Sequence, residues 1–330
     1  MQTTILNRAD LGLAVEALTR GELVAFPTET VYGLGANGLD GQACRKIFTA
    51  KGRPQDNPLI LHVLDQDWLA RLIRGTLAPS AKALIEAFWP GPLTVVVPSH
   101  DKVPAIVRAG LDTVAVRAPS HLLARALIRG VGVPLAAPSA NLSGRPSPTT
   151  AEAVFEDMNG RIPYIIDGGP SQVGLESTVV DCTTTPVTLL RPGGISIESL
   201  AGVVGEVSLP AAGSPVRSPG MKYRHYAPNA PLIWIRDTNV DFIHRALEQI
   251  SEEYGRVAVA APDPVVLSRA FLFESLGNDE FAAAQRLFHA IRTLDQENPD
   301  VIVVVWELEQ GLGLAVANRI AKAAVRQVRP

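Results

Sequence analysis

Cysteine is scarce in this chain, which has only Cys44 and Cys182 among its 330 residues. Two cysteines cannot build a disulfide framework or a full set of thiolate metal ligands. We interpret both as small buried residues of a protein in a reducing compartment. The chain should therefore be stabilised by an ordinary hydrophobic core rather than by cross-links.

Long apolar runs are missing as well. No run approaches the roughly 18 residues that suggest a transmembrane helix. Residues 1–21 carry charges and a helical period where a signal peptide has an unbroken apolar core. We therefore expect a cytoplasmic protein that has no membrane partner.

Positive charge is not in excess, because the formal net charge is −3, and aromatic residues make up only 5% of the chain. General attraction to nucleic acid is not expected, so any basic surface has to be local. The motifs GxSxG and HExxH of covalent and zinc catalysis are also absent from the sequence. Any catalysis should therefore depend on positioning and charge neutralisation.

The length allows two domains with separate cores. Over residues 1–208, strands alternate with helices and also follow one another, which predicts an α/β fold with a mixed sheet. Residues 209–229 are rich in Pro, Gly and Ser and predict a linker. Residues 230–330 follow a βαβαβα pattern that ends in a helix over 314–326, which predicts a smaller, Rossmann-like parallel α/β domain.

Gly33, Gly35 and Gly38 match the dinucleotide-binding pattern GxGxxG, and Asp56 lies roughly 20 residues further on. The match is weak, because six residues separate the preceding strand from the first glycine and Asp56 lies in a turn. We interpret these glycines as tight turns beside a strand rather than as a nucleotide site.

The densest polar chemistry follows an apolar strand at residues 23–26. Pro27 ends this strand, and a helical pattern over 42–50 then leads to Lys51 and Arg53 in a Pro-bounded turn. Cations beside turn amides suit a polyphosphate. We expect both side chains in a polar turn, where their removal should hardly change thermal stability.

Two further residues stand out because their neighbours are apolar. Arg117 is costly to bury without a partner, which is either a substrate carboxylate or an internal Asp or Glu. His62, inside the apolar run 59–63, is on residue type alone most often a core histidine. Ser139 and Asn141 follow the strand at 133–137 and either cap turns or bind phosphate.

Six separated motifs carry a family resemblance: PTETVYGLG, KGRPQDNPL, LDTVAVRAP, APSANLSGRPSPT, GLESTVVD and LRPG. In this order they resemble the YrdC family, and the linker SPGMKYRHYAP with a further domain is similar to the family's two-domain threonylcarbamoyl-AMP synthases. The resemblance implies that L-threonine, bicarbonate and ATP give threonylcarbamoyl-AMP and pyrophosphate. ATP is then a substrate, and Mg²⁺ is expected on its phosphates without side-chain ligands.

The same resemblance implies the site residues. The catalytic signature is Lys51, Arg53, Ser139 and Asn141. The implied ATP site comprises Lys51, Arg53, Asn57, Thr113, Ser139, Asn141, Ser147, Arg191 and Tyr226. The implied threonine site comprises Thr30, His62, Arg117, Ala137 and Ser177. Tyr226 would belong to a lid formed by the linker, which we expect to close over the nucleotide.

The resemblance also implies partners, namely the proteins that transfer the threonylcarbamoyl group to the adenosine beside the anticodon of tRNA; weak direct binding of tRNA is left open. One alternative is a non-catalytic RNA-binding module, although few aromatics are present to stack bases. Another is a carbamoyl-adenylate enzyme with a different acceptor, as in hydrogenase-maturation proteins. Those carry cysteine-rich zinc segments, which this chain lacks.

Overall fold

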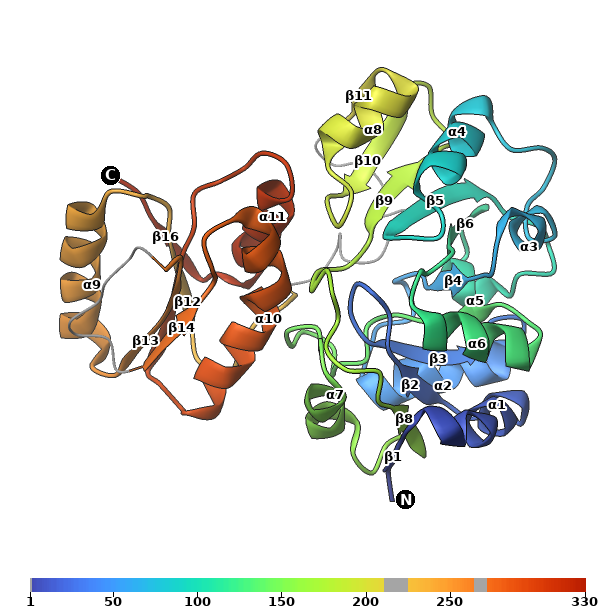
Figure 1. Ribbon diagram of the computed structural model, residues 1–330, viewed down its shortest axis with the longest axis horizontal. Coiled ribbons are helices and arrows are strands. Elements are labelled where there is room, and N and C mark those ends of the chain that lie inside the picture. Colours follow the sequence, from blue (N-terminus) through green and yellow to red (C-terminus); the bar gives the residue numbers. More distant parts are fainter. Residues whose placement is uncertain (1, 211–224, 264–271) are drawn as a thin grey trace. The chain divides into compact units, whose positions relative to one another are not determined.

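The computed structural model describes residues 2–210, 225–263 and 272–330, and the chain divides into two compact units (Figure 1). The first unit consists of Met1–Ser143, Ser147–Gln172 and Glu176–Tyr223. The second consists of Gly144–Pro146, Val173–Leu175 and Arg224–Pro330. We describe each unit separately.

The first unit is built on one large sheet. Its strands are β1 (Thr4–Leu6), β2 (Val24–Phe26), β3 (Gly33–Asn37), β4 (Ile60–His62), β5 (Leu93–Pro98), β6 (Thr113–Arg117), β7 (Leu135–Ala136), β8 (Tyr164–Ile166), β9 (Thr178–Asp181), β10 (Val187–Arg191) and β11 (Val207–Ser208). The strand order is β1-β8-β2-β3-β7-β4-β6-β5-β9-β10-β11. Parallel pairs such as β4 with β6 and antiparallel pairs such as β5 with β6 both occur. The expected mixed α/β sheet is confirmed.

Helices cover this sheet in two groups. They are the 3-10 helix η1 (Arg8–Asp10) and the α-helices α1 (Leu11–Thr19), α2 (Gly41–Lys51), α3 (Gln66–Ala70), α4 (Pro79–Phe88), α5 (Ala105–Arg108), α6 (Leu122–Val131), α7 (Ala151–Met158) and α8 (Ile197–Val204). The main core packs one face of the sheet against α2, α4, α5, α7 and α8. A second core packs β2 and β7 against α1 and α6 on the other face.

Side-chain alternation leaves a third, small cluster on the face that carries α1 and α6. Leu61 belongs to the main core, whereas its neighbour Ile60 joins Val96, Ala115 and Val179 in this cluster. Successive side chains of a strand point to opposite faces. The strands β4, β6, β5 and β9 therefore present a surface that is separate from the main core, and the polar residues described below lie on it.

The glycines of the GxGxxG match form a strand, so their interpretation as tight turns is wrong for Gly33 and Gly35. Both belong to β3, which pairs with β2 through Phe26 and Gly33. A Cβ atom on Gly35 would lie 2.8 Å from the ring of Phe26. These glycines leave room for that ring, which the spacing of glycines in the sequence does not reveal.

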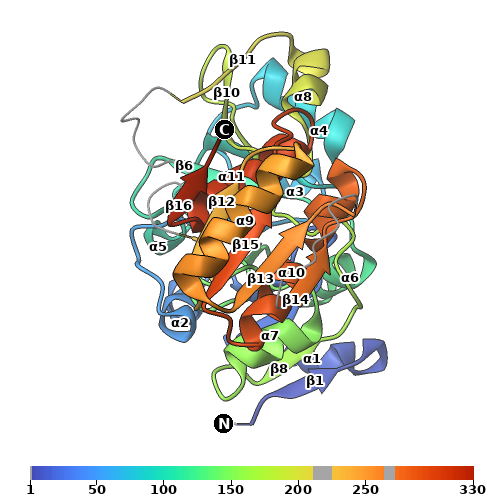
Figure 2. The same ribbon diagram turned by 90° about the vertical axis from the view of Figure 1, so that its left-hand side faces the viewer.

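The second unit contains the expected smaller parallel sheet. Its strands are β12 (Leu232–Ile235), β13 (Val257–Ala261), β14 (Leu272–Ser275), β15 (Val301–Val305) and β16 (Arg326–Val328), in the order β14-β13-β15-β12-β16. Figure 1 shows α9 (Val240–Tyr254) on one face, and α10 (Glu280–Gln296) and α11 (Gly313–Ala323) on the other. Figure 2 shows α9 in front of this sheet, running roughly along its strands.

The predicted pattern of the second unit is incomplete. The helix expected over 314–326 ends at Ala323, and Arg326–Val328 is a strand parallel to β12. An edge strand of three residues is too short to produce a periodic sequence signal. Within the described residues, no helix combines the length and apolar character needed to cross a membrane.

Candidate active site

Polar side chains form a row across four neighbouring strands of the first unit. His62 of β4 is in register with Arg117 of β6, which is in register with Thr94 of β5. In-register neighbours point to the same face of a sheet. The Thr94 hydroxyl lies 2.7 Å from that of Ser177, which directly precedes β9. We call His62, Arg117, Thr94 and Ser177 the polar row; it brings together three of the predicted threonine-binding residues.

Arg117 is the charged centre of the polar row and is only 3% exposed. Its Nη2 lies 2.6 Å from Glu29 Oε1, its Nη1 donates to Thr30 Oγ1 at 2.7 Å, and its Nε donates to the Gly91 carbonyl at 3.2 Å. An internal carboxylate therefore balances this arginine. A substrate carboxylate, if it binds here, has to join an existing ion pair.

The hydroxyl of Thr30 is oriented by its neighbours. Thr28 Oγ1 donates to the Val31 carbonyl at 2.6 Å, so its contact of 2.8 Å with Thr30 Oγ1 has Thr30 as the donor. Thr30 thus gives its proton to Thr28 and accepts from Arg117. Because a hydroxyl oxygen accepts twice, Thr30 can accept one more hydrogen bond, from a ligand hydroxyl or ammonium group.

The charges at this end of the site are balanced. Burial would raise the pKa of Glu29, but the charge and hydrogen bond of Arg117 outweigh burial and lower it. Burial, together with the nearby Arg117 charge, lowers the pKa of His62 to about 3. His62 is therefore neutral at physiological pH, and the ion pair of Glu29 and Arg117 has no net charge.

Lys51 ends α2 and is only 2% exposed, so the expectation of a polar turn is wrong for this residue. Its ammonium group donates to the carbonyl of Ser139 at 2.6 Å and to the carbonyl of Asn141. The Ser139 hydroxyl in turn donates to the Asn141 side chain. The signature residues Lys51, Ser139 and Asn141 therefore form one connected group, which we call the lysine cluster.

Arg53 and Asn57 lie just beyond α2. Arg53 is half-buried and donates to the carbonyls of Pro58, at 3.1 Å, and Asn57, at 3.4 Å. Asn57 is buried, and its Oδ1 atom has no hydrogen-bond partner among the residues that the structure describes. A buried amide oxygen without a partner is costly, so this atom is suited to a ligand or an ordered water.

Ser147 and Arg191 already have protein partners. The Ser147 hydroxyl donates to Glu176 Oε1 at 2.6 Å, and both side chains are buried. Arg191 donates from Nε and Nη2 to the carbonyl of Ser177, at 3.1 and 2.9 Å. Arg191 thereby adjoins the end of the polar row, and it adds a third cation to those of Lys51 and Arg53.

The loop after β2 joins the polar row to the lysine cluster. Its Thr30 contacts Arg117, while the backbone of Tyr32 accepts from Ala140 N–H at 2.8 Å and donates to the Pro148 carbonyl at 2.9 Å. Ala140 lies between the two signature residues of the second polar motif. The segment that looks densest in the sequence therefore connects both groups of site residues.

The remaining predicted residues are Ala137, Thr113 and Tyr226. Ala137 follows β7 and donates its N–H to the Ile60 carbonyl at 2.9 Å. Thr113 begins β6 at the end opposite Arg117. Tyr226 belongs to the second unit, where its ring centroid lies 5.2 Å from that of Phe288. Its role at the nucleotide stays a prediction, and residues 211–224 of the predicted lid lie outside the described residues.

Metal-binding side chains are not grouped in the described part of the chain: no cluster of three or more His, Cys, Asp or Glu residues suits a metal ion there. The cations of this site are Lys51, Arg53, Arg117 and Arg191.

Comparison with known families identifies the chain. Residues 16–193 match the family model for Sua5, YciO and YrdC proteins, described as "Telomere recombination". Residues 195–325 match the model described as "Threonylcarbamoyl-AMP synthase, C-terminal domain". The chain belongs to the Sua5/YciO/YrdC family.

Relatives in this family match nearly the whole chain. The threonylcarbamoyl-AMP synthase of Pyrococcus abyssi is 46% identical over 321 residues, which cover 94% of this chain and 93% of the relative. The threonylcarbamoyl-AMP synthase of Bacillus subtilis is 44% identical, and the match covers 96% of this chain and 94% of the relative. A crystal structure of P. abyssi Sua5 complexed with L-threonine has a TM-score of 0.94 and 44% identity, covering 99% of this chain and all of that one.

Sequence analysis missed three polar residues that the structure places in this Sua5/YciO/YrdC site, namely Glu29, Thr94 and Glu176. Each carried a weak signal. Glu29 is a carboxylate directly behind a strand, Thr94 is a hydroxyl within an apolar strand, and Glu176 precedes Ser177. Their partners are Arg117, Ser177 and Ser147, and only the fold brings these distant residues together.

Proposed function

We propose that this protein is an L-threonylcarbamoyladenylate synthase, which converts L-threonine, bicarbonate and ATP into threonylcarbamoyl-AMP and pyrophosphate. The observation that carries the proposal is the pairing of two chemically different groups on one loop. The polar row, with its balanced ion pair, suits a zwitterionic amino acid. The cations Lys51, Arg53 and Arg191 are of the kind that suits a triphosphate. Relatives named for this activity match the chain almost end to end.

The reaction needs two bond-forming steps. In the first, the amine nitrogen of threonine bonds to the carbon of bicarbonate, and water and a proton are released to give a carbamate. In the second, a carbamate oxygen attacks the α-phosphorus of ATP and pyrophosphate leaves. Two anions have to approach each other in this second step. Fixed cations lower that barrier, and no protein nucleophile is required.

The residues have distinct proposed roles. Lys51 and Arg53 would neutralise the phosphates, with Ser139, Asn141 and Asn57 as polar contacts to the nucleotide. Magnesium would be bound with ATP as part of that substrate, where it adds further charge neutralisation. Fixed positions matter because positioning supplies most of the catalysis in such transfers. Thr113, Ser147, Arg191 and Tyr226 complete the proposed nucleotide site.

At the other end, Arg117 would take the carboxylate of threonine, and Thr30 would accept from its hydroxyl or ammonium group. His62, Ser177 and the backbone near Ala137 would form the remaining surface of the amino-acid site. Because His62 is neutral, it adds no second positive charge beside Arg117. We propose that this keeps the pocket matched to a zwitterion rather than to a simple anion.

The division into residues 1–208, 209–229 and 230–330, with the middle segment as a lid, remains a proposal on sequence grounds. So does a cytoplasmic location, where the product would be passed to tRNA threonylcarbamoyl-transfer proteins. A ligand-dependent lid predicts that ATP with threonine protects residues 211–229 from proteolysis. Equal cleavage with and without the ligands would contradict the lid and mean that this segment is only a spacer.

Turnover tests the proposed function. Pyrophosphate release should require ATP, bicarbonate and an amino acid together, with threonine best, serine slower and valine slower than threonine by at least ~10²-fold. A site that hydrogen-bonds a hydroxyl leaves buried polar groups unpaired when valine binds. Equal rates with valine would exclude threonine as the specific substrate.

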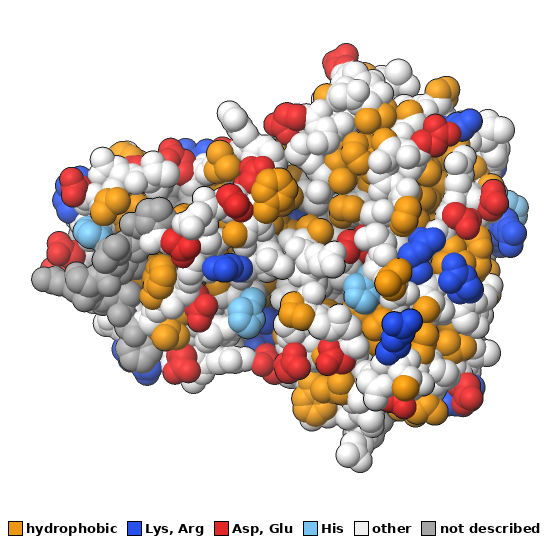
Figure 3. All heavy atoms as spheres, viewed as in Figure 1, with side chains coloured by type: hydrophobic (Ala, Val, Ile, Leu, Met, Phe, Trp, Pro, Cys, Tyr) orange, Lys and Arg blue, Asp and Glu red, His pale blue; other side chains and the backbone are white. Residues whose placement is uncertain are grey.

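A non-catalytic RNA-binding module finds less support. Figure 3 shows Lys and Arg side chains interspersed with Asp and Glu over the face drawn, rather than one continuous basic surface. The net charge of −3 is also unfavourable for a general polyanion site. RNA binding without any threonine-dependent turnover would nevertheless replace the enzymatic proposal.

A further inference from the structure

Glu29 is a buried carboxylate that contacts Arg117 of the proposed amino-acid site, and neither the family signature nor the sequence patterns assigned it a role. It is 4% exposed and lies between Thr28 and Thr30 in the loop that connects the two groups of site residues. A carboxylate in such a place costs free energy unless it is paired. Its partner is Arg117, at 2.6 Å.

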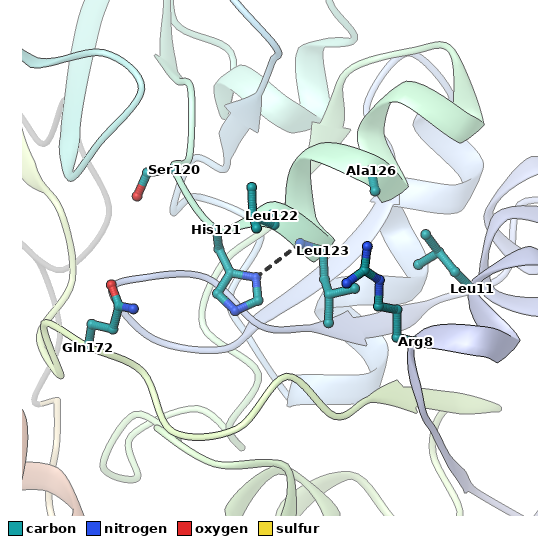
Figure 4. Close-up of a pocket in the computed structure, with 8 residues that line it drawn as sticks. All are labelled: Arg8, Leu11, Ser120, His121, Leu122, Leu123, Ala126 and Gln172. Carbon is teal, nitrogen blue, oxygen red and sulfur yellow. Dashed lines mark hydrogen bonds between the residues drawn. The ribbon is translucent and has the colours of Figure 1, made fainter.

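The surroundings of Glu29 hold its charge in place. The backbone N–H groups of Glu29 itself and of Ser120 add to the effect of Arg117 in lowering its pKa, against the opposing effect of burial. His121 also faces this charge, yet burial lowers the pKa of His121 and favours its neutral form. Ser120 and His121 also line a pocket of about 500 Å³ (Figure 4). Arg117 is thus the fixed positive partner of Glu29.

The contacts of Arg117 show what this pairing achieves. Its Nε, Nη1 and Nη2 atoms bind Gly91, Thr30 and Glu29, respectively. Each terminal nitrogen carries a second N–H, and these have no further partner among the described residues. A guanidinium whose orientation is fixed on three sides presents its remaining N–H groups in a constant direction, as recognition of a carboxylate requires.

We propose that Glu29 is a positioning residue for threonine: it does not contact the substrate, but orients Arg117 so that the arginine receives the substrate carboxylate. This inference rests on the proposed function and deepens it. A carboxylate that only competed for Arg117 would weaken substrate binding, whereas an orienting carboxylate strengthens it. The two roles therefore predict opposite effects of the same substitution.

The test is the substitution Glu29→Gln, which keeps the size of the side chain and removes its charge. We expect the KM for threonine to rise by about 10- to 100-fold, the range that corresponds to loss of a charge-assisted hydrogen bond. The KM for ATP should stay within about twofold. The conservative variant Glu29→Asp should recover part of the affinity for threonine. An unchanged or lowered KM for threonine would overturn the proposal.

A double-mutant cycle distinguishes a positioning effect through Arg117 from a non-specific effect of removing a buried carboxylate. If Glu29 acts through Arg117, then Glu29→Gln should add almost nothing to the threonine KM of an Arg117→Met variant. Additive effects would overturn the proposal. The matched control is Asp181→Asn, a buried carboxylate of the same sheet that binds the turn residue Thr183 at 2.6 Å. Its threonine KM should be unchanged.

The wild-type assay distinguishes failure of the proposed function from failure of the positioning role of Glu29. Threonine-dependent turnover by the wild-type protein is required by the proposed function alone. If it is absent, the proposed function fails. If it is present and Glu29→Gln shows the same threonine KM as the wild type, only the positioning role of Glu29 fails.

Discussion

Replacing Lys51 by Met separates the catalytic role of its charge from its structural role. The substitution keeps the unbranched side chain and removes the ammonium group that donates to the carbonyls of Ser139 and Asn141. Hydrogen bonds to a charged group contribute about 1.5–3 kcal/mol each, but burying the ammonium group costs part of this. We therefore expect a net destabilisation of roughly 1–3 kcal/mol.

For a unit of this size, 1 kcal/mol corresponds to about 2–4 °C, so the melting temperature should fall by roughly 2–12 °C. Turnover measured well below that temperature should fall at least ~10²-fold, as expected when a preorganised charge is removed. Calorimetry and pyrophosphate release measure the two effects. Turnover within threefold of wild type would refute the charge role, and an unchanged melting temperature would refute the buried hydrogen bonds.

The control lies on the same helix. Lys46 is an exposed residue of α2 whose ammonium group pairs with Glu22 at 3.0 Å. Exposed pairs contribute little to stability. Lys46→Met should therefore change neither the melting temperature nor turnover, and a loss of activity in this variant would mean that lysine removal from α2 is harmful for a reason other than the lysine cluster.

Other substitutions test further parts of the account. Arg53→Gln should reduce turnover at least ~10²-fold with less change in melting temperature than Lys51→Met, because Arg53 is half-buried whereas Lys51 is buried; wild-type turnover would exclude its role. Gly35→Ala should destabilise the protein through its clash with Phe26, whereas Gly12→Ala, in open space on α1, should stabilise it by about 0.5–1 kcal/mol; equal unfolding free energies would contradict this. Since His62 has a pKa of about 3 when folded, the unfolded state takes up a proton that the folded state excludes, and stability falls as pH drops from about 6.5 towards 3. Urea unfolding measures the free energy of unfolding at each pH. In this range the wild type should lose about 1.4 kcal/mol per pH unit more of this free energy than His62→Gln does. The same pH dependence in both proteins would contradict a buried neutral imidazole.

Local sequence patterns predicted much of the fold. The strand expected at 23–26 and the helix expected over 42–50 are found at Val24–Phe26 and Gly41–Lys51, because each is a clear local pattern with a turn signal beside it. The isolated polar residues of apolar strands, His62 and Arg117, were also singled out from the sequence alone. A polar side chain on an apolar strand is informative because burying it requires a partner.

Long-range pairing explains what the sequence did not reveal. The strand β1 covers only Thr4–Leu6 and is held by β8, about 160 residues away in the chain. The glycines of β3 form a strand beside the Phe26 ring, although their local pattern suggests turns. Both features depend on a neighbour that is distant in sequence, so the local hydrophobic pattern does not predict them.

The same limit applies to the site. Sequence analysis left the partner of Arg117 open between a substrate carboxylate and an internal acid, and the structure supplies Glu29. It also placed Lys51 in a polar turn, whereas the residue is buried by the loop from Ser139 to Asn141. Residue type indicated the chemistry, and the fold determined which charges meet.

The most direct test of the central claim is the identity of the product. The wild-type protein would be incubated with ATP, magnesium, L-threonine and isotope-labelled bicarbonate, and the nucleotides separated for mass spectrometry. The account predicts an AMP adduct that contains one threonine and the bicarbonate carbon, formed in equal amount to pyrophosphate and only when all three substrates are present. Pyrophosphate release without label in a threonine-containing nucleotide would contradict it.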